Sequence, residues 1–229
     1  MRGHRMGNNI LIIGESGSGK STAIRTLDPK ETFLINVIGK PMPFKGFRKN
    51  YLHIENWANP DSDMNFGNLY VGDNYQAILK CIELVKSRKD IKTLIIDDWQ
   101  YVLANEFMRR ASETGFSKFS EIAQHAWMLI NSLSNTRPDL VSFFISHSDT
   151  DEFGKIKCKT IGKMLNEKIS IEGLFTTVLH SVANDDGHFF MTQTDGRHLA
   201  KSPVGMFEDK LIPNDLLYVI NKIKKYEEE

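Results

Sequence analysis

The chain has 229 residues, with 29 basic and 29 acidic side chains and two cysteines. This length suits one α/β domain with a sizeable core. Balanced charge excludes a global polyelectrolyte field, so any contact with nucleic acid needs a local basic patch. Cys81 and Cys158 lie far apart and outside any CxxC pattern. This spacing disfavours a disulfide framework or a zinc site and favours a reducing cytosol.

We expect residues 1–8 to be a leader and residues 9–229 to form a single domain. No apolar stretch approaches the roughly 20 residues that span a bilayer, and no signal-peptide pattern opens the chain. The sequence therefore predicts a soluble, cytoplasmic protein.

Apolar runs alternate with helical spacing along the chain, which predicts an α/β fold with a mainly parallel sheet and helices on both faces. The expected strands are Ile10–Ile13, Thr32–Ile38, Thr93–Asp97 and Val141–Ser146. Thr176–Ala183 and His188–Thr194 flank a glycine-containing turn and predict an antiparallel hairpin near the C-terminus. Apolar stripes with helical spacing occupy residues 78–85, 122–133 and 216–223. The long segment between Gly39 and Asn74 is predicted to be functional, disordered, or made of short elements that the sequence does not resolve.

The first expected strand runs directly into Gly14–Ser21, which reads GESGSGKS and matches the phosphate-loop pattern GxxxxGK[ST] in full. Glycines let backbone N–H groups point inward around phosphate oxygens. In this pattern Lys20 reaches the β- and γ-phosphates and the Ser21 hydroxyl ligates Mg²⁺. A helix over Lys20–Leu27, ended by Asp28-Pro29, would turn its positive end toward the anion. The predicted nucleotide-binding residues here are Gly14, Glu15, Ser16, Gly17, Ser18, Gly19, Lys20, Ser21 and Thr22.

Two carboxylates follow the apolar strand Thr93–Asp97. Asp97 would lie at the carboxyl end of this strand, where open α/β sheets bind ligands, and would hold Mg²⁺ directly or through water. Asp98 is a candidate for polarising the water that attacks the γ-phosphate. The alternative for Asp98 is an N-cap of the helix expected over Trp99–Met108.

A polar group also follows the strand Val141–Ser146. A side chain at this tip could contact the γ-phosphate or its attacking water, and His147 is the first candidate, with Ser146 second. A structural histidine is the alternative. Lys20, Asp98 and His147 are thus the predicted catalytic residues.

Lysines recur between residues 153 and 168. Lys155, Lys157 and Lys159 alternate with other residues, so an extended chain would present them on one face, where they could follow a phosphate backbone. An ordinary solvated strand face is the alternative. Residues 44–51 mix cations with aromatics, and Arg109–Phe119 is a polar break between two helices. The predicted DNA-contacting residues are Lys118, Lys155, Lys157, Lys159 and Lys163.

Two cations follow the expected hairpin, in the sequence DGRHLAKSP over residues 195–203. Arg197 and Lys201 could bind phosphate in their own subunit, or reach a neighbour's nucleotide as arginine-finger-type groups. A plain surface turn is the alternative.

The order of these elements resembles the RecA-like ATPase core: a phosphate loop at Gly14, an acidic strand end at Asp97, a polar tip at His147, a lysine-rich loop, a hairpin, and then two cations. The compact form is similar to phage-encoded single-domain RecA-like ATP-binding proteins, a group that includes single-strand annealing recombinases. The resemblance implies ATP and Mg²⁺ as cofactors and ATP hydrolysis. It also implies single-stranded DNA binding by the loops Arg109–Phe119 and Asp149–Met164, for phage recombination, annealing or replication in the host cytoplasm. Nucleotide would lie between self-assembled subunits, with Arg197 and Lys201 acting across the interface.

The chain departs from this family pattern at the second strand. RecA-like cores usually carry a catalytic glutamate at its tip, where residues 36–40 here read NVIGK. Either Asp98 or Glu55 substitutes for it, or hydrolysis is slow. His147 stands in place of the glutamine common in RecA. Two alternatives stay open. A small-molecule or nucleoside kinase usually needs an arginine-rich lid that clamps its phosphorylated substrates. This reading is disfavoured because the sequence has no arginine cluster other than Arg109-Arg110. A non-catalytic, nucleotide-switched assembly or loading factor is favoured by the missing glutamate.

Overall fold

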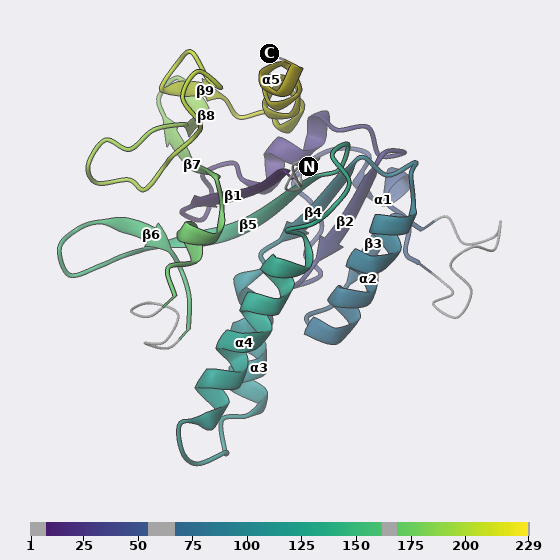
Figure 1. The fold of residues 1–229 in the computed structure, drawn as a ribbon, viewed down its shortest axis with the longest axis vertical. Helices are drawn as coiled ribbons and strands as arrows, with labels where there is room; N and C mark the ends of the chain where they lie inside the picture. Colours follow the sequence, from purple (N-terminus) through teal and green to yellow (C-terminus); the bar gives the residue numbers. More distant parts are fainter. Residues whose placement is uncertain (1–7, 55–66, 162–168, 229) are drawn as a thin grey trace, which may run out of the picture.

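The protein is built around one twisted sheet with helices on both faces (Figure 1). The computed structural model describes residues 8–54, 67–161 and 169–228. Within these ranges the parallel part of the sheet has the order β3-β2-β4-β5-β1-β7. Its strands are β1 (Asn8–Gly14), β2 (Thr32–Asn36), β3 (Leu69–Val71), β4 (Thr93–Asp97), β5 (Val141–Thr150) and β7 (Thr177–Asn184).

Three further strands pair in antiparallel fashion. They are β6 (Ile156–Cys158), which pairs with the end of β5, and β8 (Gly187–Met191) and β9 (Leu211–Pro213), which extend the sheet beyond β7. The predicted α/β fold class, with a mainly parallel sheet and an antiparallel hairpin near the C-terminus, is confirmed.

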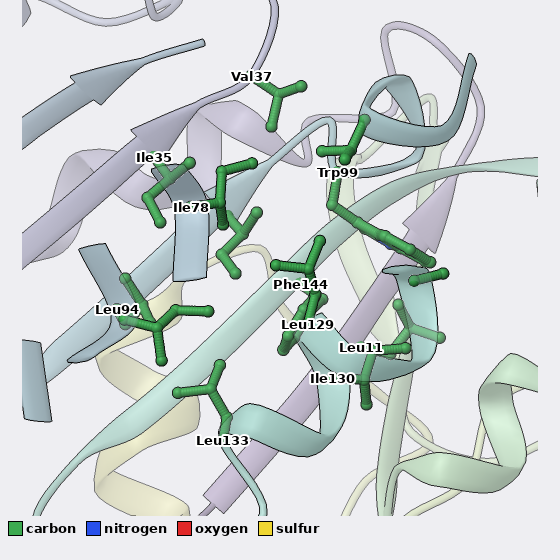
Figure 2. Packing of buried hydrophobic residues seen from close by; sticks show 14 of the residues in the cluster. Leu11, Ile35, Val37, Ile78, Leu94, Trp99, Leu129, Ile130, Leu133 and Phe144 are labelled. Carbon is green, nitrogen blue, oxygen red and sulfur yellow. The ribbon is translucent and has the colours of Figure 1, made fainter. Parts of the chain in front are cut away.

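Period-two alternation along the strands supplies the core on both faces of the sheet. In β1, Leu11 and Ile13 belong to one buried cluster, whereas Ile10 and Ile12 belong to the other. The first cluster is covered by α2 (Tyr75–Ser87), α3 (Gln100–Arg109), α4 (Ser117–Ser132) and the short η3 (Ile171–Leu174). Figure 2 shows Leu11 and Phe144 of the sheet in this cluster, with Trp99 and Leu129 beside them.

The second face is covered by the 3-10 helix η1 (Ser21–Thr26), by α1 (Phe47–Asn50) and by α5 (Leu216–Glu228). The three predicted apolar stripes lie on α2, α4 and α5, and their apolar residues are buried. Among the described helices, none is long and apolar enough to cross a membrane.

The helix after the phosphate loop differs from the prediction. We expected Lys20–Leu27, but the ordered turn is the 3-10 helix η1, which ends at Thr26. The chain is already extended at Leu27, ahead of the Asp28-Pro29 stop. Six residues of 3-10 helix contribute little dipole, so phosphate binding has to depend on the loop's N–H groups and on Lys20.

Several short elements escaped prediction. The long segment between Gly39 and Asn74 contains α1 and β3 in its described part, and β6 and β9 have three residues each. β5 continues past its predicted end at Ser146 to Thr150, because its last residues pair with β6. In Figure 1, α3 and α4 form a helical hairpin that projects from the sheet, and the β5–β6 hairpin projects at another edge.

Candidate nucleotide-binding site

The phosphate loop begins where β1 meets its neighbours. Gly14 lies opposite His147 of β5 on one side and Ser181 of β7 on the other. A Cβ at Gly14 would lie 2.6 Å from the Ser181 carbonyl oxygen and 2.7 Å from Ser18 Oγ. Only glycine therefore fits at the first loop position, for a steric reason. Gly19, by contrast, is needed for its backbone, which has a φ of 95°.

Lys20 is buried at the base of the loop. Its ammonium group donates hydrogen bonds to the carbonyl oxygens of Gly14, at 2.8 Å, and Glu15, at 2.6 Å. Burial lowers the pKa of Lys20, and the carboxylates of Asp98 and Asp97 oppose that shift. The cation thus lies inside the loop that is expected to surround phosphate, and it is held there by backbone contacts.

Ser21 and Asp97 form a pair of oxygen ligands. The Ser21 hydroxyl lies 3.0 Å from both carboxylate oxygens of Asp97, to which it donates. Asp97 is 3% exposed at the carboxyl end of β4, and burial, followed by the neighbouring Asp98, raises its pKa to about 7. A buried carboxylate beside a hydroxyl fits a hard cation such as Mg²⁺, which usually adds phosphate oxygens and water to one or two protein ligands. No group of three or more His, Cys, Asp or Glu side chains that could hold a metal occurs in the described ranges.

Asp98, directly after β4, and His147 in β5 form a second pair. His147 Nε2 lies 3.4 Å from Asp98 Oδ1. Asp98 has a φ of 58°, the only positive φ outside glycine among the described residues. Burial would raise the pKa of Asp98, but the hydrogen bond and charge of His147, with Lys20 and Lys40, lower it overall.

The alternative role of Asp98 as a helix cap is wrong. The N-cap position of α3 is Trp99, and no side chain caps that helix end. The left-handed turn instead directs the Asp98 carboxylate to His147. Ser146, the second candidate at the β5 tip, is fully buried and donates to the His147 carbonyl oxygen, so His147 is the residue that reaches the site.

These groups face one cleft of about 320 Å³. Its walls are the phosphate loop through Thr22, the tips of β2, β4 and β5, the segment 40–43, and His188 from β8. The sequence reasoning missed Lys40 and His188. Lys40 belongs to the tip of the second strand, where the sequence analysis considers only the missing glutamate and not the lysine. His188 lies against Gly19, where a Cβ would be 3.0 Å from the imidazole ring. No local sequence pattern predicts this contact.

The lysines within and beside β6 lie as the alternation predicts. Ile156 and Cys158 are buried, whereas Lys155 and Lys159 are exposed and Lys157 is partly exposed between them. The Lys159 backbone N–H donates to the His147 carbonyl oxygen at 2.9 Å, so the lysine row begins beside the cleft. Lys163 and Glu55 lie outside the described residues.

Lys118 requires a correction. It is 7% exposed, and its ammonium group donates to the carbonyl oxygens of Arg110, Ala111 and Glu113. It therefore closes the turn between α3 and α4 and is not free to contact DNA.

Arg197 and Lys201 do not line the cleft of their own subunit. Their backbones pair with Ile156 and Val178 respectively. Phosphate contact within the same subunit therefore has no support from this cleft, and contact across an interface and a plain surface turn stay open.

A complete phosphate loop, a serine–aspartate pair for Mg²⁺ and a polar strand tip around one cleft define a P-loop nucleoside-triphosphatase fold. The family model described as AAA domain matches residues 6–204. The chain therefore belongs to the AAA-domain family and is a P-loop ATPase domain. No curated protein matches it in sequence.

Among the solved structures that are similar in fold is one described as a prototypical ATPase from the type III secretion system of pathogenic bacteria. The similarity covers 79% of this chain and 52% of that chain, with 12% sequence identity and a TM-score of 0.47. This chain thus spans about half the length of that ATPase.

Proposed function

We propose that this protein hydrolyses ATP and couples hydrolysis to the binding of single-stranded DNA. The observation that carries the proposal is the convergence of Lys20, the Ser21–Asp97 pair and the Asp98–His147 pair on one cleft. The resemblance to phage-encoded annealing proteins supports a role in phage recombination, annealing or replication.

The residues of the cleft have separable tasks. The loop N–H groups and Lys20 bind the β- and γ-phosphates, for which Lys20 gives up its present carbonyl partners. Ser21 and Asp97 would hold Mg²⁺, which would supply charge neutralisation at the phosphate oxygens. Asp98, kept ionised by His147, orients the attacking water and accepts its proton.

The route from nucleotide to DNA follows β5. His147 lies in this strand, which ends at Thr150 before the turn to β6 and the lysines beside it. The bond from Lys159 N–H to the His147 carbonyl oxygen ties the two ends of that hairpin together. A shift of His147 on contact with γ-phosphate would move the lysine row.

A nucleotide-switched loading factor without turnover is the second candidate. It is favoured by the β2 tip, where Asn36 and Lys40 line the cleft in place of the glutamate of RecA-like cores. Such a protein would bind ATP but would not hydrolyse it.

Phosphate release from ATP, measured with and without single-stranded DNA, tests the proposal. We expect release that DNA stimulates and that Lys20→Ala abolishes. ATP binding without release, in either condition, would favour the loading factor. Transfer of the γ-phosphate to an added nucleoside would favour a kinase and contradict the proposal.

A further inference from the structure

The tip of β2 carries a turn that is fixed by a buried side chain. Asn36, 2% exposed, accepts a hydrogen bond from the Gly39 N–H at 2.9 Å and donates one to the Lys40 carbonyl oxygen at 2.7 Å. Gly39 has a φ of 71°, which suits the tight return of the chain. The amide of Asn36 thereby sets where the backbone of Lys40 leaves the sheet.

This turn presents Lys40 to the nucleotide cleft. Both Asn36 and Lys40 line the cleft, together with the carboxylates of Asp97 and Asp98. Lys40 is close enough to Asp98 for the two charges to interact. Among the described residues, Lys40 forms no ion pair or side-chain hydrogen bond. Its ammonium group is therefore exposed at the cleft and available to an anion.

The two lysines of the cleft come from different places. Lys20 is supplied by the phosphate loop after β1, whereas Lys40 comes from the tip of β2, which pairs with β4 beside Asp97. The Ser21–Asp97 and Asp98–His147 pairs mark the end of the cleft where the metal and the γ-phosphate belong. A triphosphate has its most concentrated charge at that end, so a second cation there stabilises it.

We propose that Lys40 contacts the γ-phosphate of bound triphosphate as a second cation from within the same chain, with Asn36 as its positioning residue. The inference rests on the proposed function and names the group that distinguishes triphosphate from diphosphate. The β2 tip then stabilises phosphate charge, where the tip of a RecA-like core usually supplies a carboxylate.

The test compares Mg²⁺-dependent affinities for ATPγS and ADP by calorimetry. For Lys40→Met we expect the Kd for ATPγS to rise at least about tenfold and the Kd for ADP to change less than about twofold, because a charged hydrogen bond to the γ-phosphate is lost. Lys40→Arg should keep most of the preference for triphosphate. Asn36→Ala should show the same selective loss, to a smaller extent. Lys30→Met, at an exposed lysine outside the cleft, is the matched control.

If Lys40→Met lost affinity for ATPγS and ADP equally, the inference would be overturned. It would also be overturned if the affinity for neither nucleotide changed. Thermal melting of the same variant checks that the fold is intact, which we expect since the Lys40 side chain is exposed. A wild-type chain that binds neither nucleotide would instead overturn the proposed function itself. The two failures are therefore distinguishable.

Discussion

At the scale of the residue, Gly14 of the phosphate loop is required because a side chain would not fit, whereas Gly19 is required for its positive φ. Gly14→Ala would place a Cβ within 2.6 Å of a backbone oxygen of β7, which cannot move without disturbing the sheet. We expect a loss of about 1–3 kcal/mol in the free energy of unfolding, measured with urea. Gly173→Ala, where the nearest atom is at 3.6 Å, is the control and should change stability by less than about 1 kcal/mol. Equal stability of the two variants would show that the loop is looser than described.

His180 gives a second prediction at this scale. It is 2% exposed in β7, and burial, followed by the charges of His198 and Lys20, lowers its pKa from 6.5 to about 4, with Asp195 opposing. Above about pH 6.5 the residue is neutral in both states. As the pH falls toward 4, the unfolded chain takes up a proton that the folded chain excludes, so stability is lost in this window and not further below it.

Urea unfolding at several pH values checks this sign. Between pH 6.5 and 4, the wild type should lose up to about 3 kcal/mol more than His180→Asn, which cannot titrate. If the free energy of unfolding had the same pH dependence in the wild type and in His180→Asn, the lowered pKa of His180 would be contradicted.

At the scale of the element, the β5–β6 hairpin carries the proposed DNA contact. Lys155→Glu combined with Lys157→Glu should weaken binding of single-stranded DNA at least about tenfold and reduce the slope of log K against log salt by about 1–2, since each phosphate contact adds ~0.7 to the slope for single strands. Fluorescence anisotropy with a labelled oligonucleotide over a salt series measures both.

The matched control reverses two exposed charges on another element, with Lys224→Glu combined with Lys225→Glu on α5. This pair should leave the salt slope unchanged. If the β6 variant behaved like the α5 variant, the hairpin would not be the DNA-binding element.

The elements with strong periodicity could be predicted from the sequence, and those defined by pairing could not. β4 has the predicted bounds because its apolar run is buried on both faces and ends at a charge. β6 and β9, of three residues each, become strands only by pairing with β5 and β8.

The same division applies to the site. The phosphate loop, Asp97, Asp98 and His147 lie in or directly after recognisable local patterns and were predicted. The contact of His188 with Gly19 and the burial of Lys118 depend on how distant segments pack, which no local pattern of residues encodes.

At the scale of the whole molecule, the parallel order of the sheet assembles the cleft. With β5 inserted between β1 and β4, the phosphate loop, the carboxylates and His147 end at one edge, and β2 adds Lys40 from the far side of β4. Segments that are distant in the chain thus meet around a single volume for nucleotide. We therefore expect this cleft to bind ATP through Lys20.

Calorimetric titration of the wild type and Lys20→Ala with ATP and Mg²⁺ tests whether this cleft is the nucleotide site. We expect saturable binding of one nucleotide per chain in the wild type, weakened at least about tenfold in Lys20→Ala through loss of a charge-assisted contact to phosphate. Circular dichroism establishes that the variant is folded. Absence of ATP binding by the wild type, or equal affinity of the folded variant, would contradict the account.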